Sequence, residues 1–351
     1  MSLAALAAVD FVDKPQQFDC VIDARSPAEF ADDHLPGALN WPVLDDEQRR
    51  IVGTLYKQES PLRARKVGAA MVARNIASHV EQWVQDKPRD WRPLVYCWRG
   101  GQRSGSLAWF LGQIGFRTAQ LSGGYKGWRA IVREQLTVLP RQFHYRVLCG
   151  RTGSGKTRLL NTLAEQGAQT LDLEGLALHR GSVLGGLPGQ PQPSQKRFDT
   201  LLWQALKGFD ASRPVFVESE SRKIGALRVP EALIEHMREH GECLRVDMGD
   251  AARLDLLLQD YNFFIDDVER FCGLLDALRE IRGHDCVNGW QAAARAGRWS
   301  EVFASLMDLH YDPLYERSLR RSFKQLDRAR LVRLQDGGTA ALRDAARQAM
   351  A

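Results

Sequence analysis

The sequence lacks the features of a membrane, secreted or disordered protein. It has no run of about 18–20 uncharged apolar residues, the length that a membrane-spanning helix needs. The first residues, MSLAALAAVDF, hold no basic side chain and reach Asp10 early, so we expect no signal peptide. Hydrophobic residues make up 44% of the chain and charged residues 26%, as in ordinary globular proteins. We therefore expect a cytoplasmic protein that does not bind membranes, with roughly two domains in its 351 residues.

Cysteine is scarce, and neither sign of charge is in large excess. The six cysteines form no CxxC pair, which in a reducing compartment argues against disulfides and zinc sites. The net charge is +5, from 48 Lys and Arg against 43 Asp and Glu. A net charge this small does not by itself predict nucleic-acid binding, so such a role has to rest on local clusters of basic residues.

Two glycine-rich loops are present, and each directly follows an apolar strand. The first strand covers residues 93–98 and leads into RGGQRSG; the second covers residues 145–150 and leads into RTGSGKT. A strand, a glycine-rich turn and a helix begin a βα unit, so two such starts indicate two α/β domains. We place the first domain at residues 1–136, a linker containing Pro140 at residues 137–144, and the second domain at residues 145–351.

The pattern around these loops predicts the remaining architecture. Ser26, Pro27 and Glu29 form the signature of a helix N-terminus. Past Arg253 the pattern is helical almost to the end of the chain. Short apolar runs predict further strands at residues 21–25, 118–123, 170–175, 215–220 and 243–248. The predicted fold class is α/β, with a P-loop NTPase-like second domain that has a helical C-terminal part.

Cys97 is the candidate nucleophile of the first loop. It ends a predicted buried strand, and the residues after it include Arg99, Arg103 and three glycines before an apolar helix. Glycines let backbone N–H groups turn inward, and a helix N-terminus with nearby cations favours a thiolate near neutral pH. The alternative is a buried cysteine that acts as a small hydrophobic residue, but that role does not require such a loop.

The second loop, GRTGSGKT at residues 150–157, has the complete P-loop pattern between a strand and a helix. Lys156 is expected to reach the outer oxygens of a diphosphate, and Thr157 to hold Mg²⁺. The absence of an NKxD-type motif favours a non-nucleotide diphosphate or a kinase-like arrangement. The expected diphosphate-binding residues are Gly150, Thr152, Gly153, Ser154, Gly155, Lys156 and Thr157.

Acidic residues follow a later apolar strand, as expected for a P-loop protein. Glu218 and Glu220 are candidates to bind Mg²⁺ or to act as a base, while the alternative is that both face solvent at a strand end. Asp172 and Glu174 are weaker candidates for the same roles.

Three segments resemble the signatures of a rhodanese domain, in the same order. They are DARSPAEFADDHLPGALNWP (residues 23–42), YCWRGGQRS (residues 96–104) and LSGGYKGW (residues 121–128). In that family the loop cysteine carries sulfur as a persulfide. Five residues separate Cys97 from Arg103, one more than in most sulfur-transferring rhodaneses, as in the rhodanese-like phosphatases. The longer loop implies a bulkier tetrahedral ligand that carries a phosphate.

A rhodanese-like domain followed by a P-loop domain is similar to the bacterial tRNA 2-selenouridine synthase family. Residues 178–199, VESESRKIG at residues 217–225 and HYDPLY at residues 310–315 add to the resemblance. It implies that the sulfur of a wobble 2-thiouridine in tRNA is replaced by selenium from selenophosphate. An S-geranyl intermediate made from geranyl diphosphate is also implied, with Mg²⁺ and no organic cofactor.

The resemblance also implies roles for the two loops. Cys97 is expected to attack selenium and deliver it to C2 of the pyrimidine, and the P-loop is expected to bind geranyl diphosphate. Selenophosphate is expected to lie against Arg99, Gly100, Gly101, Gln102, Arg103 and Ser104.

A tRNA substrate requires a basic surface, for which the C-terminal region offers a candidate. A helical spacing places five basic residues on one face, namely Arg317, Arg320, Arg321, Lys324 and Arg328. The alternative is an ordinary solvated helix face. His179, Arg180 and the loop at residues 185–195 are further candidates, and Tyr125, Trp128 or Tyr311 are candidates to stack on a base.

Some residues are expected to be structural, and two alternative functions remain open. Phe263, Phe264 and Phe271 are expected to be core rather than a slot for a geranyl chain, and Cys149 to be a buried strand residue. The alternative function is a rhodanese-like sulfurtransferase or phosphatase fused to an ATP-binding kinase-like domain. In a third interpretation one loop is degenerate and its domain only docks tRNA, although intact Cys97 and Lys156 argue against it. We expect a monomer.

Overall fold

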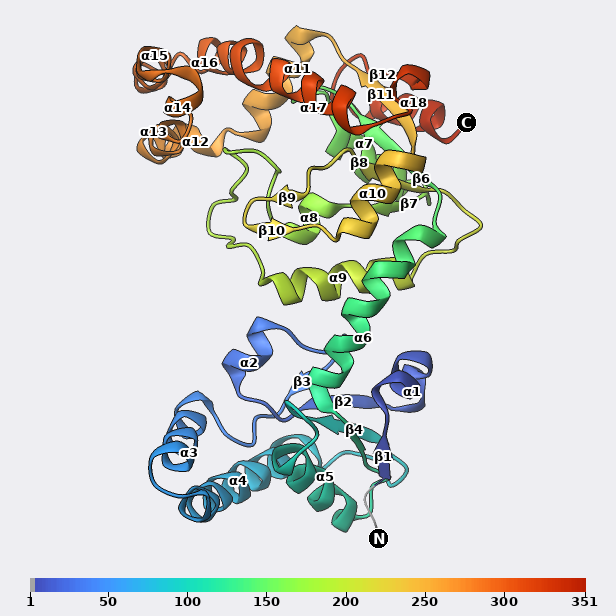
Figure 1. Cartoon of the computed structure of the whole chain (residues 1–351), viewed down its shortest axis with the longest axis vertical. Helices are drawn as coiled ribbons and strands as arrows, with labels where there is room; N and C mark the ends of the chain where they lie inside the picture. Colours follow the sequence, from blue (N-terminus) through green and yellow to red (C-terminus); the bar gives the residue numbers. More distant parts are fainter. Residues whose placement is uncertain (1–3) are drawn as a thin grey trace. The chain divides into compact units, whose positions relative to one another are not determined.

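The computed structural model describes residues 4–351, and the chain divides into two compact units, Met1–Gln135 and Leu136–Ala351. Both units are α/β with a parallel five-stranded sheet, as predicted (Figure 1). Within the described residues no helix is both long and apolar enough to cross a membrane.

The sheet of the first unit has the strand order β1-β5-β4-β2-β3, and every neighbouring pair is parallel. β4 lies in the middle and is buried along its whole length, so the loop that follows it leaves the sheet at its centre. The strands are β1 (Ala4–Leu6), β2 (Cys20–Asp23), β3 (Leu39–Asn40), β4 (Pro93–Tyr96) and β5 (Ala119–Leu121).

The helices of the first unit follow from local signals in the sequence. The predicted N-terminus after β2 is confirmed: Ser26 and Glu29 form a capping box, and Pro27 is the first helical residue. α5 packs against β4 and β5, and α4 packs against α5 and α3. The helices are α1 (Ala8–Asp13), α2 (Pro27–Asp32), α3 (Asp46–Gln58), α4 (Pro61–Trp83), α5 (Gln102–Ile114) and α6 (Gly124–Val138), with a 3₁₀ turn at Pro15–Gln17.

Residues 137–144, the predicted linker, do not form an extended segment. α6 itself crosses the division between the units, and a 3₁₀ turn, Leu139–Gln142, continues the chain. Pro140 and Phe143 are buried. Proline is tolerated at the first positions of a helical turn, so its presence here did not interrupt the structure.

The second unit is built on a parallel sheet with the order β12-β11-β6-β8-β7. The P-loop follows β6, which lies at the centre of this sheet between β11 and β8. α7 packs against β7, β8 and the last helix, α18. The strands are β6 (Tyr145–Cys149), β7 (Gln169–Leu171), β8 (Val215–Glu218), β11 (Glu242–Asp247) and β12 (Arg330–Arg333), with a separate hairpin of β9 (Lys223–Ile224) and β10 (Leu227–Arg228).

Helices surround this sheet and form a second core beside it. Phe264 and Phe271 are fully buried in that second core, as their interpretation as core residues predicted. The helices next to the sheet are α7 (Lys156–Glu165), α8 (Leu173–Ala177), α9 (Gln195–Lys207), α10 (Glu231–His240) and α18 (Thr339–Met350). The others are α11 (Asp250–Asp260), α12 (Phe263–Asp266), α13 (Val268–Asp276), α14 (Arg279–Arg282), α15 (His284–Arg295), α16 (Trp299–Leu306), a π-helical turn (Met307–Tyr311) and α17 (Asp312–Ser322).

The prediction of helix almost to the chain end was wrong after Ser322. α17 ends there because Phe323 turns into the interior, with an extended backbone and 4% of its surface exposed. A 3₁₀ turn, Leu326–Arg328, follows, and then β12 pairs with β11 and buries Val332. The five basic residues expected on one helical face are therefore divided between α17 and the segment after it.

Candidate functional sites

Cys97 lies directly after β4, and its side chain is buried beneath the loop that follows. Its sulfur accepts a hydrogen bond from the Gly101 N–H at 3.3 Å and one from the Ser104 hydroxyl at 3.1 Å. Both donors come from the start of α5. Hydrogen-bond donors and the positive end of a helix both place positive potential at this sulfur. The geometry therefore suits a nucleophilic cysteine.

The carbonyl groups of this loop accept hydrogen bonds from β5 and the start of α6. The donors are the backbone N–H groups of Tyr125 and Lys126 and the side-chain amide of Gln120. The Tyr125 N–H donates to the Cys97 carbonyl at 2.8 Å, and the Lys126 N–H donates to the Trp98 carbonyl at 3.0 Å. The Gln120 amide nitrogen lies 2.9 Å from the Gly100 carbonyl oxygen and 3.1 Å from that of Gly101. Hydrogen bonds from β5 and α6 to its carbonyl oxygens thus fix the position of the cysteine loop.

Gly124, the first residue of α6 and the second of a glycine pair, lies close to the cysteine loop. Its φ is +54°, and a Cβ atom there would lie 2.5 Å from the Gly100 nitrogen and closer still to the Cys97 carbonyl oxygen. Any larger residue would push the segment away from the loop. The motif LSGGYKGW therefore shapes the cysteine loop from the neighbouring strand.

The two loop arginines are placed differently from each other. Arg99 is exposed to solvent, whereas the guanidinium of Arg103 donates to the Glu29 carboxylate at 2.6 Å and 3.3 Å. Arg49 also pairs with Glu29, at 2.8 Å. Burial acts to raise the pKa of Glu29, but the hydrogen bond and charge of Arg103, with the charge of Arg49, hold that pKa below its usual range. An anion in this loop therefore competes with Glu29 for Arg103. The sequence pattern had assigned Glu29 only to helix capping.

Tyr125 and Trp128 are not available to stack on a base. They are 2% and 0% exposed, so these two candidates were wrong. The buried guanidinium of Arg25 lies 4.1 Å from the centre of the Tyr125 ring and forms an ion pair with Asp23 at 2.6 Å. These residues stabilise the interior of the first unit.

The P-loop curves around the first turn of α7. Gly153 and Gly155 have φ values of +76° and +77°, which other residues rarely adopt. The Lys156 ammonium donates to the carbonyl oxygens of Gly150 at 2.7 Å and Arg151 at 3.3 Å, and so lies across the loop. Six of the seven predicted diphosphate residues, those from Thr152 to Thr157, line a cavity of about 590 Å³.

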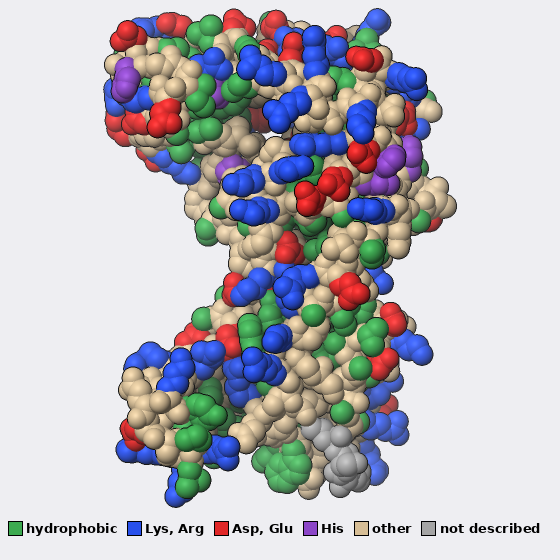
Figure 2. All heavy atoms as spheres, viewed as in Figure 1, with side chains coloured by type: hydrophobic (Ala, Val, Ile, Leu, Met, Phe, Trp, Pro, Cys, Tyr) green, Lys and Arg blue, Asp and Glu red, His purple; other side chains and the backbone are tan. Residues whose placement is uncertain are grey.

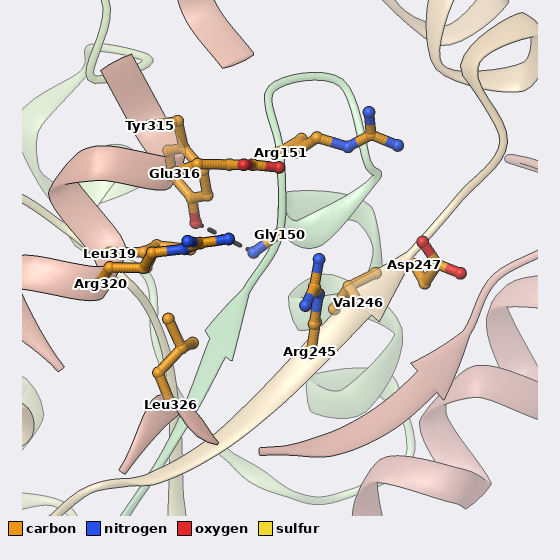
Figure 3. A pocket seen from close by; sticks show the side chains of 10 residues that line it. All are labelled: Gly150, Arg151, Arg245, Val246, Asp247, Tyr315, Glu316, Leu319, Arg320 and Leu326. Carbon is orange, nitrogen blue, oxygen red and sulfur yellow. Dashed lines mark hydrogen bonds between the residues drawn. The ribbon is translucent and has the colours of Figure 1, made fainter. Parts of the chain in front are cut away.

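The seventh, Gly150, lines a smaller pocket of about 50 Å³ beside the loop (Figure 3). Its N–H donates to the Tyr315 hydroxyl oxygen at 2.9 Å, and that hydroxyl lies 2.6 Å from the Ser219 hydroxyl. Arg245 of β11 and Arg320 of α17 line the same pocket. Tyr315 belongs to the segment HYDPLY and thus fixes the start of the P-loop.

A buried ion pair fixes the middle of the P-loop. Arg253 of α11 is 0% exposed and donates twice to the Thr152 carbonyl, at 2.8 Å and 3.0 Å. The same guanidinium binds both oxygens of Asp312, at 2.6 Å and 2.9 Å, and Asp250 at 2.8 Å. The sequence patterns did not identify Arg253 or Asp312 as site residues. Tyr315 thus connects α17 to the start of the P-loop at Gly150, and Asp312, through Arg253, connects α17 to its middle at Thr152.

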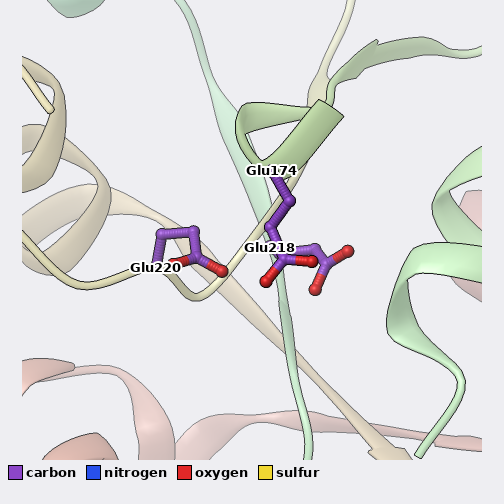
Figure 4. Close-up of side chains that lie close together, drawn as sticks. All are labelled: Glu174, Glu218 and Glu220. Carbon is purple, nitrogen blue, oxygen red and sulfur yellow. The ribbon is translucent and has the colours of Figure 1, made fainter. Parts of the chain in front are cut away.

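Three carboxylates meet at the carboxyl end of β8, on the wall of the cavity (Figure 4). Oxygen atoms of Glu174, Glu218 and Glu220 all lie within 4.8 Å of one another. Burial, then the charge of Glu218, raises the pKa of Glu174 to about 10 and that of Glu220 to about 7. One buried oxygen of Glu218 has no hydrogen-bond partner among the described residues. Carboxylate oxygens are the ligands that Mg²⁺ prefers, so this donor set fits a magnesium ion.

The predicted basic residues lie on and after α17. Arg317, Arg320 and Arg321 belong to α17, whereas Lys324 and Arg328 follow it. Lys324 pairs with Glu239 at 3.3 Å. Within the described residues none of the four arginines forms an ion pair, and Figure 2 shows Lys and Arg side chains gathered over α17.

Arg238 of α10 joins this basic group and also lines the P-loop cavity. Burial lowers the pKa of Arg238, and the neighbouring charges of Arg222 and Arg321 lower it further. Its buried Nε has no hydrogen-bond partner in the part of the chain that the structure describes, residues 4–351. A guanidinium in such surroundings favours an anionic partner.

The remaining candidates divide between the cavity wall and the interior. Arg180 and Tyr311 line the cavity, and the Arg180 guanidinium lies 5.0 Å from the centre of the Tyr261 ring. Burial lowers the pKa of His179. Cys149 is 0% exposed in β6, as predicted.

Two family models match the chain, one for each unit. The model described as "Rhodanese-like domain" matches residues 7–131. The model described as "tRNA 2-selenouridine synthase AAA domain" matches residues 143–282.

Several curated proteins are similar to the chain, and those compared below are each named tRNA 2-selenouridine synthase. The protein of Nitrosomonas europaea is 38% identical over 69% of this chain and 63% of its own length. That of Alcanivorax borkumensis is 34% identical over 74% of this chain and 72% of its own length. That of a Sulfurovum species is 30% identical over 87% of this chain and 90% of its own length.

Solved structures resemble parts of the chain. A rhodanese-related protein from Thermoplasma volcanium is 19% identical over 36% of this chain and 92% of its own, with a TM-score of 0.25. A rhodanese-like domain protein from Staphylococcus aureus is 13% identical over 36% of this chain and 91% of its own, with a TM-score of 0.24.

Proposed function

Because the chain belongs to the tRNA 2-selenouridine synthase family, we propose that it replaces the 2-thio sulfur of a wobble uridine in tRNA by selenium. One observation carries the proposal: the same chain holds a buried cysteine whose sulfur accepts two hydrogen bonds, and a P-loop beside three carboxylates. The first site suits a tetrahedral anion and the second a diphosphate. Selenophosphate and geranyl diphosphate are the corresponding proposed substrates.

In the proposed reaction, the 2-thio sulfur is alkylated in the P-loop cavity. The sulfur of 2-thiouridine attacks the first carbon of geranyl diphosphate, a C–S bond forms, the C–O bond to the diphosphate breaks, and the N3 proton of the base is released to solvent. Lys156 and the loop N–H groups are placed to stabilise the departing diphosphate. The cavity, at about 590 Å³, lies in the range of volumes that hold small organic ligands.

Mg²⁺ is proposed at Glu174, Glu218, Glu220 and Thr157. The fit rests on the three clustered carboxylates and on the unpartnered buried oxygen of Glu218. When bound, the ion neutralises charge on a diphosphate and so makes it a better leaving group. Glu220 and Glu174 give up their protons to form this site.

Cys97 supplies the second step. Attack on selenium would form an S–Se bond but expel phosphorus with the bonding electrons, as phosphite. Attack on phosphorus forms an S–P bond, breaks the P–Se bond and releases selenide, and water then hydrolyses the phosphocysteine to phosphate. We place the attack on phosphorus because it balances without a reductant or oxidant and suits a phosphatase-like loop. Selenide then adds to C2, and the geranyl thiolate leaves.

The tRNA is proposed to bind along the basic residues on and after α17, together with Arg238 of α10. Among the residues that the structure describes, Arg317, Arg320, Arg321 and Arg328 form no ion pair, and Arg238 extends the same basic group into the cavity wall. Each phosphate contact made by such residues steepens the dependence of binding on salt concentration.

The test follows nucleosides of a 2-thiouridine tRNA by mass spectrometry. The protein is given geranyl diphosphate first and selenophosphate second. The proposal expects geranylthiouridine and then selenouridine, with Cys97→Ser stopping at the geranyl product and Lys156→Ala blocking it. Selenouridine formed by Cys97→Ser at the normal rate refutes the role of Cys97. ATP hydrolysis without either nucleoside supports the alternative, a rhodanese-like sulfurtransferase or phosphatase fused to a kinase-like domain.

The tRNA surface is tested by reversing charges. Replacing Arg320, Arg321 and Lys324 by Glu is expected to weaken tRNA binding at physiological salt and to leave geranyl diphosphate binding unchanged. Equal tRNA affinity for variant and parent contradicts this surface. The matched control reverses three exposed arginines elsewhere in the unit, Arg295, Arg298 and Arg343.

A further inference from the structure

Gln120 makes contacts to the cysteine loop that its place in the sequence does not reveal. It lies on β5, just before the glycine pair. Its amide nitrogen is 2.9 Å from the Gly100 carbonyl oxygen, 3.1 Å from that of Gly101, and 2.8 Å from the Ser104 hydroxyl oxygen. One side chain therefore reaches three polar groups around Cys97.

These neighbours determine which end of the amide faces the loop. Both carbonyl oxygens can only accept hydrogen bonds, so the amide oxygen of Gln120 would be repelled there. The NH₂ group must face them, and its two hydrogens are shared among the three acceptors. Tyr125 and Lys126 donate to this loop through backbone N–H groups, which a side-chain substitution does not remove. The Gln120 donor is a side-chain amide, and a substitution can remove it.

The hydroxyl of Ser104 has one hydrogen and two acceptors within reach. Its oxygen lies 3.1 Å from the Cys97 sulfur and 3.3 Å from the Gly101 carbonyl oxygen. The Gly101 carbonyl oxygen also accepts the Gly105 N–H at 2.9 Å, so donation from Gln120 fills its second acceptor site, and donation to the Ser104 hydroxyl oxygen polarises that O–H bond. Both effects direct the Ser104 hydrogen toward sulfur.

We propose that Gln120 is a positioning residue, which acts through Ser104 to present a hydrogen-bond donor to the Cys97 sulfur and fixes the loop from outside. It does not touch substrate. The inference deepens the rhodanese half of the proposed function, because a sulfur held as thiolate is the required nucleophile.

The test measures alkylation of Cys97 by iodoacetamide as a function of pH, with the Cys97 peptide quantified by mass spectrometry. Gln120→Met keeps the length of the side chain and removes the donor. We expect the pH of half-maximal alkylation rate to rise by about one unit, which is a tenfold slower reaction well below that pH. Cys286, in the other unit, is the internal reference, and Gln85→Met, an exposed substitution in the same unit, is the matched control.

A double-mutant cycle separates positioning from general damage. Ser104→Ala alone is expected to raise the half-maximal pH, and adding Gln120→Met to it is expected to cause little further shift. Fully additive shifts, or an unchanged profile for Gln120→Met, overturn the proposal. If Gln120→Met does not fold, Gln120→Glu keeps the shape and replaces the donors by acceptors, and the same upward shift is expected.

This assay needs neither tRNA nor selenium. Failure of selenium transfer by the parent protein therefore refutes the proposed function and leaves the role of Gln120 to be decided by the alkylation profile. An unchanged profile with normal selenium transfer refutes only the role of Gln120.

Discussion

Asp312→Asn is the substitution that most directly tests how the P-loop is held. The Asp312 carboxylate is 15% exposed and binds the fully buried guanidinium of Arg253, which in turn holds the Thr152 carbonyl. The substitution keeps the shape of the side chain and removes its charge. Arg253 then remains buried with its main counter-charge missing.

The expected loss follows from burial. Removing one partner of a buried ion pair costs about 3–5 kcal/mol, because the remaining charge is uncompensated. With a urea m-value of about 3 kcal/mol/M, as expected for a larger domain, the unfolding midpoint of the second unit falls by about 1–1.7 M. Hydrogen–deuterium exchange of peptides from β6 and β8 in urea reports this unit separately from the first.

Asp250→Asn is the matched control, because Asp250 also binds Arg253 but has a side chain that is 68% exposed. Exposed pairs contribute about 0–1 kcal/mol, so the control is expected to change the midpoint by less than about 0.3 M. Equal losses for the two variants, or a loss below about 1 kcal/mol for Asp312→Asn, would refute the reasoning that burial makes this pair essential.

Three further outcomes are expected. Mg²⁺ binding strengthens as pH rises from about 6 to 8, because Glu220, with a pKa of about 7, must lose its proton, and strengthens further toward pH 10, because Glu174, with a pKa of about 10, must also lose one; titration calorimetry should show a flatter dependence between pH 6 and 8 for Glu220→Gln. Tyr315→Phe leaves the buried N–H of the first P-loop glycine without its acceptor and lowers stability by about 1–3 kcal/mol, and an unchanged urea midpoint contradicts this. Gly124→Ala forces a methyl group against the Cys97 carbonyl and destabilises the first unit by about 1–3 kcal/mol in thermal unfolding, whereas Gly53→Ala, in open space, does not.

The local parts of both sites could be predicted from the sequence. A buried strand, glycines and a helix start are consecutive, so Cys97 and Lys156 are placed correctly between strand and helix by their own neighbours. The capping box at Ser26 follows from residues three positions apart. These features depend on short-range geometry, which the residue order contains.

The long-range parts could not be predicted in the same way. Arg253 and Asp312 are 59 positions apart, and charges at that distance carry no local pattern. Glu29 was interpreted as a capping residue, and only the fold shows that it also binds Arg103. The basic spacing continued past Ser322, but burial of Phe323 ended the helix, so tertiary packing overrode the periodic signal.

The contact between Tyr315 and Gly150 has a consequence for how the chain acquires its P-loop during synthesis. The two residues are 165 positions apart, so a ribosome completes the loop sequence long before it makes the residues that fix it. The match to the synthase-type domain ends at residue 282, before Asp312, Tyr315 and β12. A fragment cut at that boundary would contain every residue of the P-loop motif and none of its C-terminal supports. The functional boundary of this domain therefore extends at least to the end of β12.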